Sequence, residues 1–146
     1  MTPPVLLLTF NRPDTTLEAF EAIRAARPAR LYFAADGPRS DRPGEAERCA
    51  EVRSIATAVD WPCEVKTLFR EHNLGCCDAV NGAIDWFFSL EHEGVVIEDD
   101  IVPHPKFFSF AKEMLEKYRQ ADEVFFVSGY NRVPRKFGPH GHFFSR

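Results

Sequence analysis

The sequence lacks the segments that usually anchor a protein in a membrane or direct its secretion. It has no run of about 18 apolar residues, and no basic segment precedes the short apolar stretch at residues 5–10. It has only four cysteines, and none of them forms the CxxC pair that is typical of zinc sites. We therefore expect a cytoplasmic protein with reduced thiols and no membrane span.

The sequence also lacks the glycine motifs of the common nucleotide-binding classes. No glycine occurs in residues 9–13, where dinucleotide-binding proteins carry GxGxxG, and the GxxxxGK[ST] motif is absent throughout. A phospho-receiver domain would carry acidic residues after its first strand, whereas here they follow the fourth expected strand. The net charge of −4 disfavours a nucleic-acid-binding protein, because such proteins cluster lysine and arginine.

Strand and helix patterns alternate along the 146 residues, of which 45% are hydrophobic. Apolar runs predict strands at residues 5–10, 31–35, 64–69, 95–97 and 124–127. Proline positions and helical spacing predict helices that begin at Pro13 and Pro43, and further helices over residues 79–88 and 105–119. This alternation predicts a single α/β domain, residues 1–146, with a mostly parallel sheet and helices on both faces.

Polar residues follow the expected strands at the places where α/β proteins bind ligands. In parallel sheets, the ligand lies beyond the carboxyl ends of the strands, where the strand order reverses. The candidate binding residues are those at the ends of the first four strands, namely Thr9, Asn11, Arg12, Asp36, Asn73, Gly75, Glu98, Asp99 and Asp100.

The acidic run Glu98-Asp99-Asp100 is the most informative of these strand ends. Three adjacent carboxylates repel one another, and placing them beside a buried strand is costly unless a cation or hydrogen bonds offset the charge. Mg²⁺ and Mn²⁺ take oxygen ligands and often share them with substrate phosphates. The run therefore fits a metal–diphosphate site, although an acidic turn at a helix start is the alternative.

Three other strand ends have two interpretations each. Arg12 is suited to bind a phosphate through its guanidinium fork, or it is an exposed arginine at a helix start. Asp36 is suited to accept a hydrogen bond from a base N–H or a ribose hydroxyl, or it belongs to an Asp-Gly turn. Asn73 and Gly75 are suited to bring the backbone close to a flat base, or Asn73 caps the following helix.

Four of these segments occur in an order that resembles a known family. They are residues 8–13 (LTFNRP), 36–38 (DGP), 73–75 (NLG) and 98–100 (EDD). Together they resemble the nucleotide-diphospho-sugar glycosyltransferases of the GT-A fold, most of all bacterial family-2-like members and the N-acetylglucosaminyltransferase I group. The resemblance covers about residues 4–131 and implies a three-layer, Rossmann-like α/β domain that binds a nucleotide sugar.

The resemblance implies how the nucleoside would be held. Thr9 and Asn11 would line the nucleotide pocket, and Asp36 would hydrogen-bond the base, which is expected to be uracil. Asn73 and Gly75 would flank the base and the ribose. The expected donor is therefore a UDP-sugar, and the acceptor is not defined.

The resemblance also implies roles around the diphosphate. Arg12 would contact the diphosphate, and Glu98 and Asp99 would touch the ribose or the donor sugar. Asp100 would bind a Mn²⁺ or Mg²⁺ ion that bridges the two phosphates. Such an ion would neutralise the charge that builds up on the departing diphosphate, as in other Lewis-acid catalysts.

One element of an inverting glycosyltransferase is missing from this interpretation. Such enzymes need a general base, but the acidic residues that follow the EDD motif lie on or after a helix and suit this role poorly: Glu113, Glu116, Asp122 and Glu123. We therefore expect a chain that ends before the acceptor side of the enzyme. The alternative is a truncated, non-catalytic nucleotide-sugar-binding domain, and an exposed sheet edge would allow it to form a homodimer.

Overall fold

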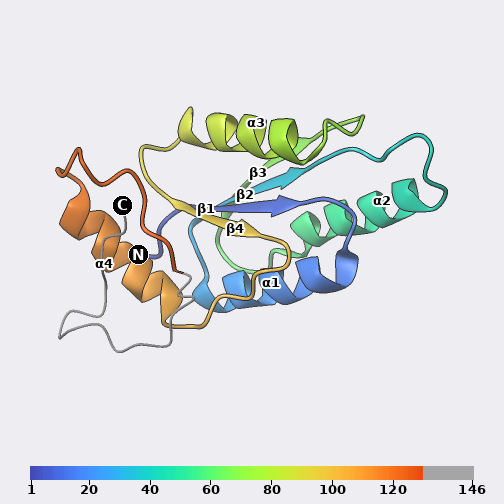
Figure 1. Cartoon of the computed structure of the whole chain (residues 1–146). Coiled ribbons are helices and arrows are strands. Elements are labelled where there is room, and N and C mark those ends of the chain that lie inside the picture. The colour runs from blue at the N-terminus through green and yellow to red at the C-terminus, as the bar shows by residue number, and fades with distance from the viewer. Residues whose placement is uncertain (130–146) are drawn as a thin grey trace, which may run out of the picture.

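The computed structural model describes residues 1–129 as one α/β unit (Figure 1). Strands and helices alternate in chain order as β1 (Val5–Thr9), α1 (Pro13–Ala26), β2 (Arg30–Ala35), α2 (Glu45–Ile55), the short 3-10 helix η1 (Ala56–Ala58), β3 (Glu64–Phe69), α3 (Cys76–Phe88), β4 (Val95–Glu98) and α4 (Phe107–Tyr118). The predicted α/β class is thereby confirmed, and each of the first four predicted strands is present.

The four strands form one sheet in the order β3-β2-β1-β4, and every neighbouring pair is parallel. Strand β1 lies at the centre, where Leu7 pairs with Phe33 of β2 on one side and with Ile97 of β4 on the other. All five residues of β1 are buried, as expected for a central strand that is covered on both faces. Because the strands are parallel, their carboxyl ends lie along one edge of the sheet (Figure 1).

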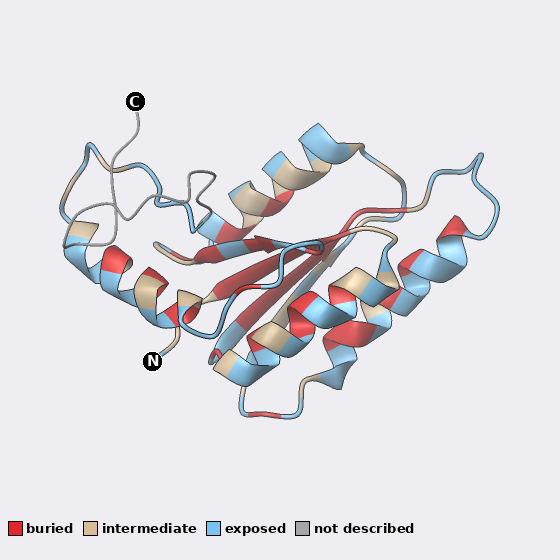
Figure 2. Ribbon diagram, turned by 60° about the horizontal axis from the view of Figure 1, so that its bottom comes forward, coloured by how far each residue is buried: buried red, intermediate tan, exposed pale blue. Residues whose placement is uncertain are grey.

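Helices cover both faces of the sheet and produce three layers (Figures 1 and 2). Side chains alternate across a strand, so Leu7 and Phe33 point towards α1, α2 and α4, whereas Leu6 and Tyr32 point towards α3. The cluster beneath α1 and α2 is the larger one, and within residues 1–129 only α3 covers the opposite face. The fold is therefore the predicted three-layer, Rossmann-like arrangement. No helix within residues 1–129 is both long enough and apolar enough to span a membrane.

The predicted fifth strand at residues 124–127 is wrong. This segment forms no strand, and Phe125 and Phe126 are 96% and 76% exposed. It leaves α4 through two turns, in which the N–H of Ala121 donates to Tyr118 O and the N–H of Val124 donates to Ala121 O. The run of valine and phenylalanine favours a strand, but within residues 1–129 no neighbouring strand provides a ladder for it.

Candidate functional site

The candidate site lies at the carboxyl edge of the sheet, where the strand order reverses. The chain passes from β1 to β2 and β3 on one side and then returns to the other side of β1 with β4. The reversal therefore falls between β1 and β4, which is the position where open α/β sheets bind their ligands. Arg12 follows β1, and Asp99 and Asp100 follow β4, so the topology brings these predicted residues together.

Arg12 forms ion pairs with both aspartates across this point. Its Nη2 donates to Asp99 Oδ1, and its Nη1 lies 3.1 Å from Asp100 Oδ2. The side chains of Arg12 and Asp100 are 51% and 43% exposed, whereas that of Asp99 is only 5% exposed. Because Arg12 follows β1 and both carboxylates follow β4, these ion pairs join the loops after the two strands.

Asp99 is the buried member of this group, and its hydrogen bonding is incomplete. Its Oδ2 is buried and has no hydrogen-bond partner among residues 1–129. Burial raises the pKa of the Asp99 carboxyl above its usual value, although the charge of Arg12 opposes this effect. A buried carboxylate oxygen without a donor is costly, and it marks a position where a further donor or a cation would be stabilising.

Asp36 connects the loops that follow β2 and β3. Its carboxylate accepts hydrogen bonds from the N–H of Gly37 at 2.8 Å, from Nδ2 of Asn73 at 2.9 Å and from the N–H of Leu74 at 3.0 Å. Asn73 therefore does not cap helix α3, whose N-cap is Gly75. The structure brings Asp36 and Asn73 together as predicted, but it shows them bound to each other.

Gly37 and Gly75 permit this loop arrangement for different reasons. A Cβ atom on Gly37 would lie 2.4 Å from the carbonyl carbon of His72, so the two loops pack too closely for a side chain. Gly75 has a φ of 80°, which favours glycine, and a Cβ there would meet nothing within 4 Å. The first glycine is required by packing and the second by backbone conformation.

Asn11 and Thr9 are held by side-chain hydrogen bonds at the end of β1. The Asn11 Nδ2 donates to Glu45 Oε1 at 2.8 Å, and the Thr9 Oγ1 donates to Ala34 O at 2.9 Å. Glu45, the fully buried first residue of α2, also accepts hydrogen bonds from Arg39, including one of 2.7 Å from its backbone N–H. Hydrogen bonds from Arg39 lower the pKa of Glu45 to about 2.

The roles of Glu45 and Arg39 were not predicted from the sequence. Arg39 lies between β2 and α2, and Glu45, the first residue of α2, lies 34 positions after Asn11. An acidic residue in the first turn of a helix is common, so its type gives no indication of burial. Only its contact with the end of β1 identifies it as a support for the candidate site.

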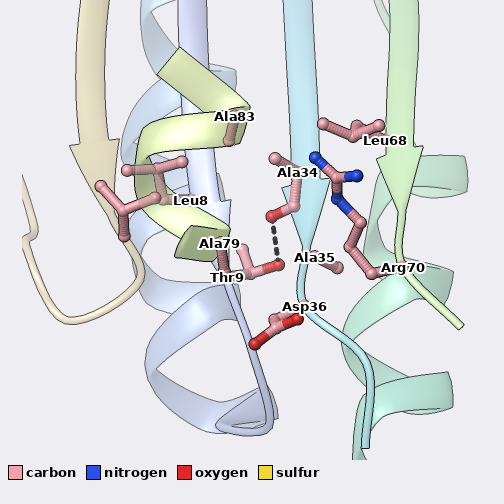
Figure 3. Close-up of a pocket in the computed structure, with 10 residues that line it drawn as sticks. Leu8, Thr9, Ala34, Ala35, Asp36, Leu68, Arg70, Ala79 and Ala83 are labelled. Carbon is pink, nitrogen blue, oxygen red and sulfur yellow. Dashed lines mark hydrogen bonds between the residues drawn. The ribbon is translucent and has the colours of Figure 1, made fainter. Parts of the chain in front are cut away.

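A hollow opens on the α3 face of the sheet, beside these loops (Figure 3). Its cavity volume is about 30 Å³, enough for one or two water molecules, and the rest of the hollow is open to solvent. Its lining residues come from the three strands β1, β2 and β3 or their ends, and from α3: Leu8, Thr9, Ala34, Ala35, Asp36, Leu68, Arg70, Ala79, Val80 and Ala83. Mostly apolar walls with a few polar groups at one end are typical of small-molecule sites.

Arg70 is the cation of this hollow; it belongs to the strand-end stretch 70–75, but the sequence predicted no role for it. It follows β3 on the same face as Leu68, which is why its side chain lies beside α3 (Figure 3). A Cβ atom on Gly82 would come within 2.9 Å of Arg70 Nη2, so the missing side chain leaves room for the guanidinium. The place of Arg70 directly after a strand was the signal that could have identified it.

Glu98 is the last residue of β4 and is exposed. Residues 1–129 contain no group of three His, Cys, Asp or Glu side chains that could hold a metal ion by themselves. The pair Asp99 and Asp100 fits a different type of site, in which one or two carboxylates hold Mg²⁺ together with substrate phosphates.

Comparison with known proteins leaves the site chemistry as the basis for assigning a function. Neither the protein-family models nor the curated proteins yield a match for this chain. The site offers one cation and two carboxylates at the reversal of strand order, and a mostly apolar hollow beside them.

Proposed function

We propose that this chain is the donor-binding domain of a metal-dependent glycosyltransferase that transfers a sugar from a nucleotide diphosphate. The main supporting observation is that Arg12, Asp99 and Asp100 meet where the strand order reverses. The motif order in the sequence supports the same family, and a UDP-sugar is the expected donor.

The charges at the reversal point suit a diphosphate that carries a divalent cation. The Arg12 fork matches the geometry of phosphate oxygens, and Asp100 is exposed enough to reach a cation at the surface. Asp99, whose Oδ2 has no hydrogen-bond partner within residues 1–129, would support the same cation. When bound, Mn²⁺ or Mg²⁺ supplies charge neutralisation for the departing diphosphate.

The open side of the hollow beside α3 is the surface against which the nucleoside of the same ligand would lie, because the cavity itself has room for only one or two water molecules. Neighbouring strands lie about 4.8 Å apart, so the middle of the β1/β4 pair is about 10 Å from the middle of the β2/β3 pair. A nucleoside diphosphate is long enough to reach both places. Thr9 and Asp36 lie between them, and the loop of Asn73 and Gly75 lies beside them.

A second candidate function is a nucleotide-sugar-binding domain that catalyses no transfer. The acidic residues that follow the EDD motif within residues 1–129 are exposed, and they lie on α4 or directly after it: Glu113, Glu116, Asp122 and Glu123. Helix α4 lies towards the amino ends of the strands, away from the candidate site (Figure 1). None of these acids is placed to activate an acceptor hydroxyl at that site.

Calorimetric titration tests the donor site directly. We expect UDP and UDP-sugars to bind in the presence of Mn²⁺ and to bind much more weakly in EDTA. The Asp100→Ala variant should lose the increase in UDP affinity that Mn²⁺ produces. Asp85→Ala, an exposed control on α3, should keep it. Absence of binding, or binding that is indifferent to Mn²⁺ and to Asp100, would contradict the proposal.

Turnover distinguishes the two candidates. UDP release from UDP-sugars, measured with the purified chain and a panel of acceptor sugars, would favour the enzyme. Tight metal-dependent binding without release under the same conditions would favour the binding domain.

A further inference from the structure

We propose that Arg12 couples the binding of the metal ion to the binding of the diphosphate, so that neither ligand binds well alone. The proposal rests on the proposed function, because it assumes that a divalent cation and a diphosphate share this site. It adds that, in the free protein, Arg12 offsets part of the negative charge of Asp99 and Asp100 until both ligands arrive.

The ion pairs at the reversal point are the basis for this inference. The guanidinium of Arg12 is engaged with Asp99 and Asp100 at the same time, so one cation is shared between the two anions of the site. The position that a divalent ion would take beside the carboxylates therefore already faces a positive charge. The guanidinium that would bind the diphosphate is likewise already bound to the two aspartates.

Each ligand alone meets a cost that the other ligand would remove. A divalent cation that approaches the two aspartates is repelled by Arg12. A diphosphate that draws Arg12 away leaves Asp99 buried without its cation, beside the negative charge of Asp100, and a buried carboxylate that loses its partner is strongly destabilising. When both ligands bind, the phosphates take the guanidinium and the metal takes the carboxylates, and every charge keeps a partner.

The local structure allows Arg12 to change partners without unfolding. Its backbone is fixed as the N-cap of α1, where its carbonyl oxygen accepts hydrogen bonds from Thr16 N at 3.0 Å and Thr16 Oγ1 at 2.7 Å. Its side chain is 51% exposed, so the guanidinium is not confined by packing. A fixed backbone with an exposed, long side chain suits a group that moves by a few ångströms between two sets of anions.

Calorimetry of three titrations measures the coupling. MnCl₂ alone, UDP alone and UDP in saturating MnCl₂ are titrated into the wild type, Arg12→Ala, Arg12→Lys and Arg24→Ala. Arg24 is the matched control, because it is a 43% exposed arginine that contacts two carboxylates, Asp60 and Glu21, in the last turn of α1. Thermal unfolding of each variant establishes that it is folded.

We expect Arg12→Ala to change the affinity for Mn²⁺ alone and the affinity for UDP with Mn²⁺ in opposite directions. In the wild type, Mn²⁺ should increase UDP affinity by about fivefold or more. The Arg12→Ala variant should bind Mn²⁺ alone more tightly and UDP–Mn²⁺ more weakly, so its coupling factor falls towards one. Arg12→Lys, which keeps the charge but not the fork, should lie between these values, and Arg24→Ala should match the wild type.

Two results would overturn the inference in distinguishable ways. If the wild type binds UDP with Mn²⁺, but Arg12→Ala leaves Mn²⁺-only affinity unchanged or lowers it, the coupling role is wrong and the donor site stands. If the wild type binds neither ligand even when both are present, the proposed function fails and the coupling role fails with it.

Discussion

At the scale of single residues, the carboxyl edge of the sheet contains three buried acids that obtain their partners in different ways. Asp36 is held by backbone and amide donors from two loops, and Glu45 by Arg39 and Asn11. Asp99 has Arg12, but one of its oxygens has no donor within residues 1–129. Buried carboxylates require compensation, so the incompletely satisfied acid is the one most suited to a ligand.

Glu45 gives a prediction about stability and pH. Its pKa is about 2 in the folded protein and 4.5 ordinarily, mainly because of its hydrogen bonds with Arg39. Between these values the unfolded chain binds more protons, so the stabilisation by ionised Glu45 is present above about pH 4.5 and is lost as the pH falls towards 2. We expect Glu45→Gln to be less stable than the wild type at pH 7, with a shallower loss of stability on acidification.

Urea unfolding between pH 3 and pH 7 measures this difference. Glu47→Gln, an exposed change in the same helix turn, is the control and should keep the wild-type slope. An identical pH dependence in Glu45→Gln and the wild type would show that the contact between Glu45 and Arg39 does not stabilise the fold.

At the scale of elements, the loops after β2 and β3 behave as one unit, because Asp36 and Asn73 connect them and Gly37 packs against His72. The polar end of the hollow beside α3 lies at this junction, where Asp36 is one of its lining residues. A disturbance of the loop contact should therefore reach the proposed nucleoside site, even though Gly37 does not line it.

Substitution of Gly37 by alanine tests this coupling between loops. Its Cβ would lie 2.4 Å from the His72 carbonyl carbon, so the loops must separate at a cost of about 1–3 kcal/mol. We expect Gly37→Ala to lower both the urea midpoint and the UDP affinity. Gly94→Ala is a matched control. Gly94 directly precedes β4, at the amino end of this strand, and its Cβ would lie 2.3 Å from the ring of Phe87 in α3. It should lower stability but leave UDP affinity unchanged, and equal effects of both variants on binding would contradict the prediction.

The sequence predicted the elements better than the contacts between them. Apolar runs and helical spacing identified β1 to β4 and the four α-helices, and the strand-end rule placed Arg12 beside Asp99 and Asp100. The strand at residues 124–127 was wrong, because a local pattern gives strand propensity but does not supply a partner. The contact between Asn11 and Glu45 depends on how α2 is placed, which no local pattern encodes.

At the scale of the whole molecule, the sheet order divides the carboxyl edge into a charged part and a mostly apolar part. Arg12, Asp99 and Asp100 meet beside the β1/β4 pair, whereas the hollow lies over β1, β2 and β3 under α3. In the described part of the chain α3 covers that face, and small residues such as Ala34, Ala79 and Ala83 leave space between this helix and the sheet. This division predicts that the two halves of a nucleotide diphosphate can be tested separately.

Filling the hollow should remove the nucleoside contribution and spare the diphosphate contribution. We expect Ala79→Leu to weaken UDP binding in Mn²⁺ by about tenfold or more, because the larger side chain would cover the surface against which the base would pack. Binding of pyrophosphate in Mn²⁺ should stay within about twofold of the wild type, since it depends on the charged part alone. Ala50→Leu, an exposed substitution on α2, controls for the added side chain. If Ala79→Leu reduces UDP and pyrophosphate binding equally, the hollow is not the nucleoside site, whereas selective loss of UDP places the base beside α3 and the phosphates beside Arg12.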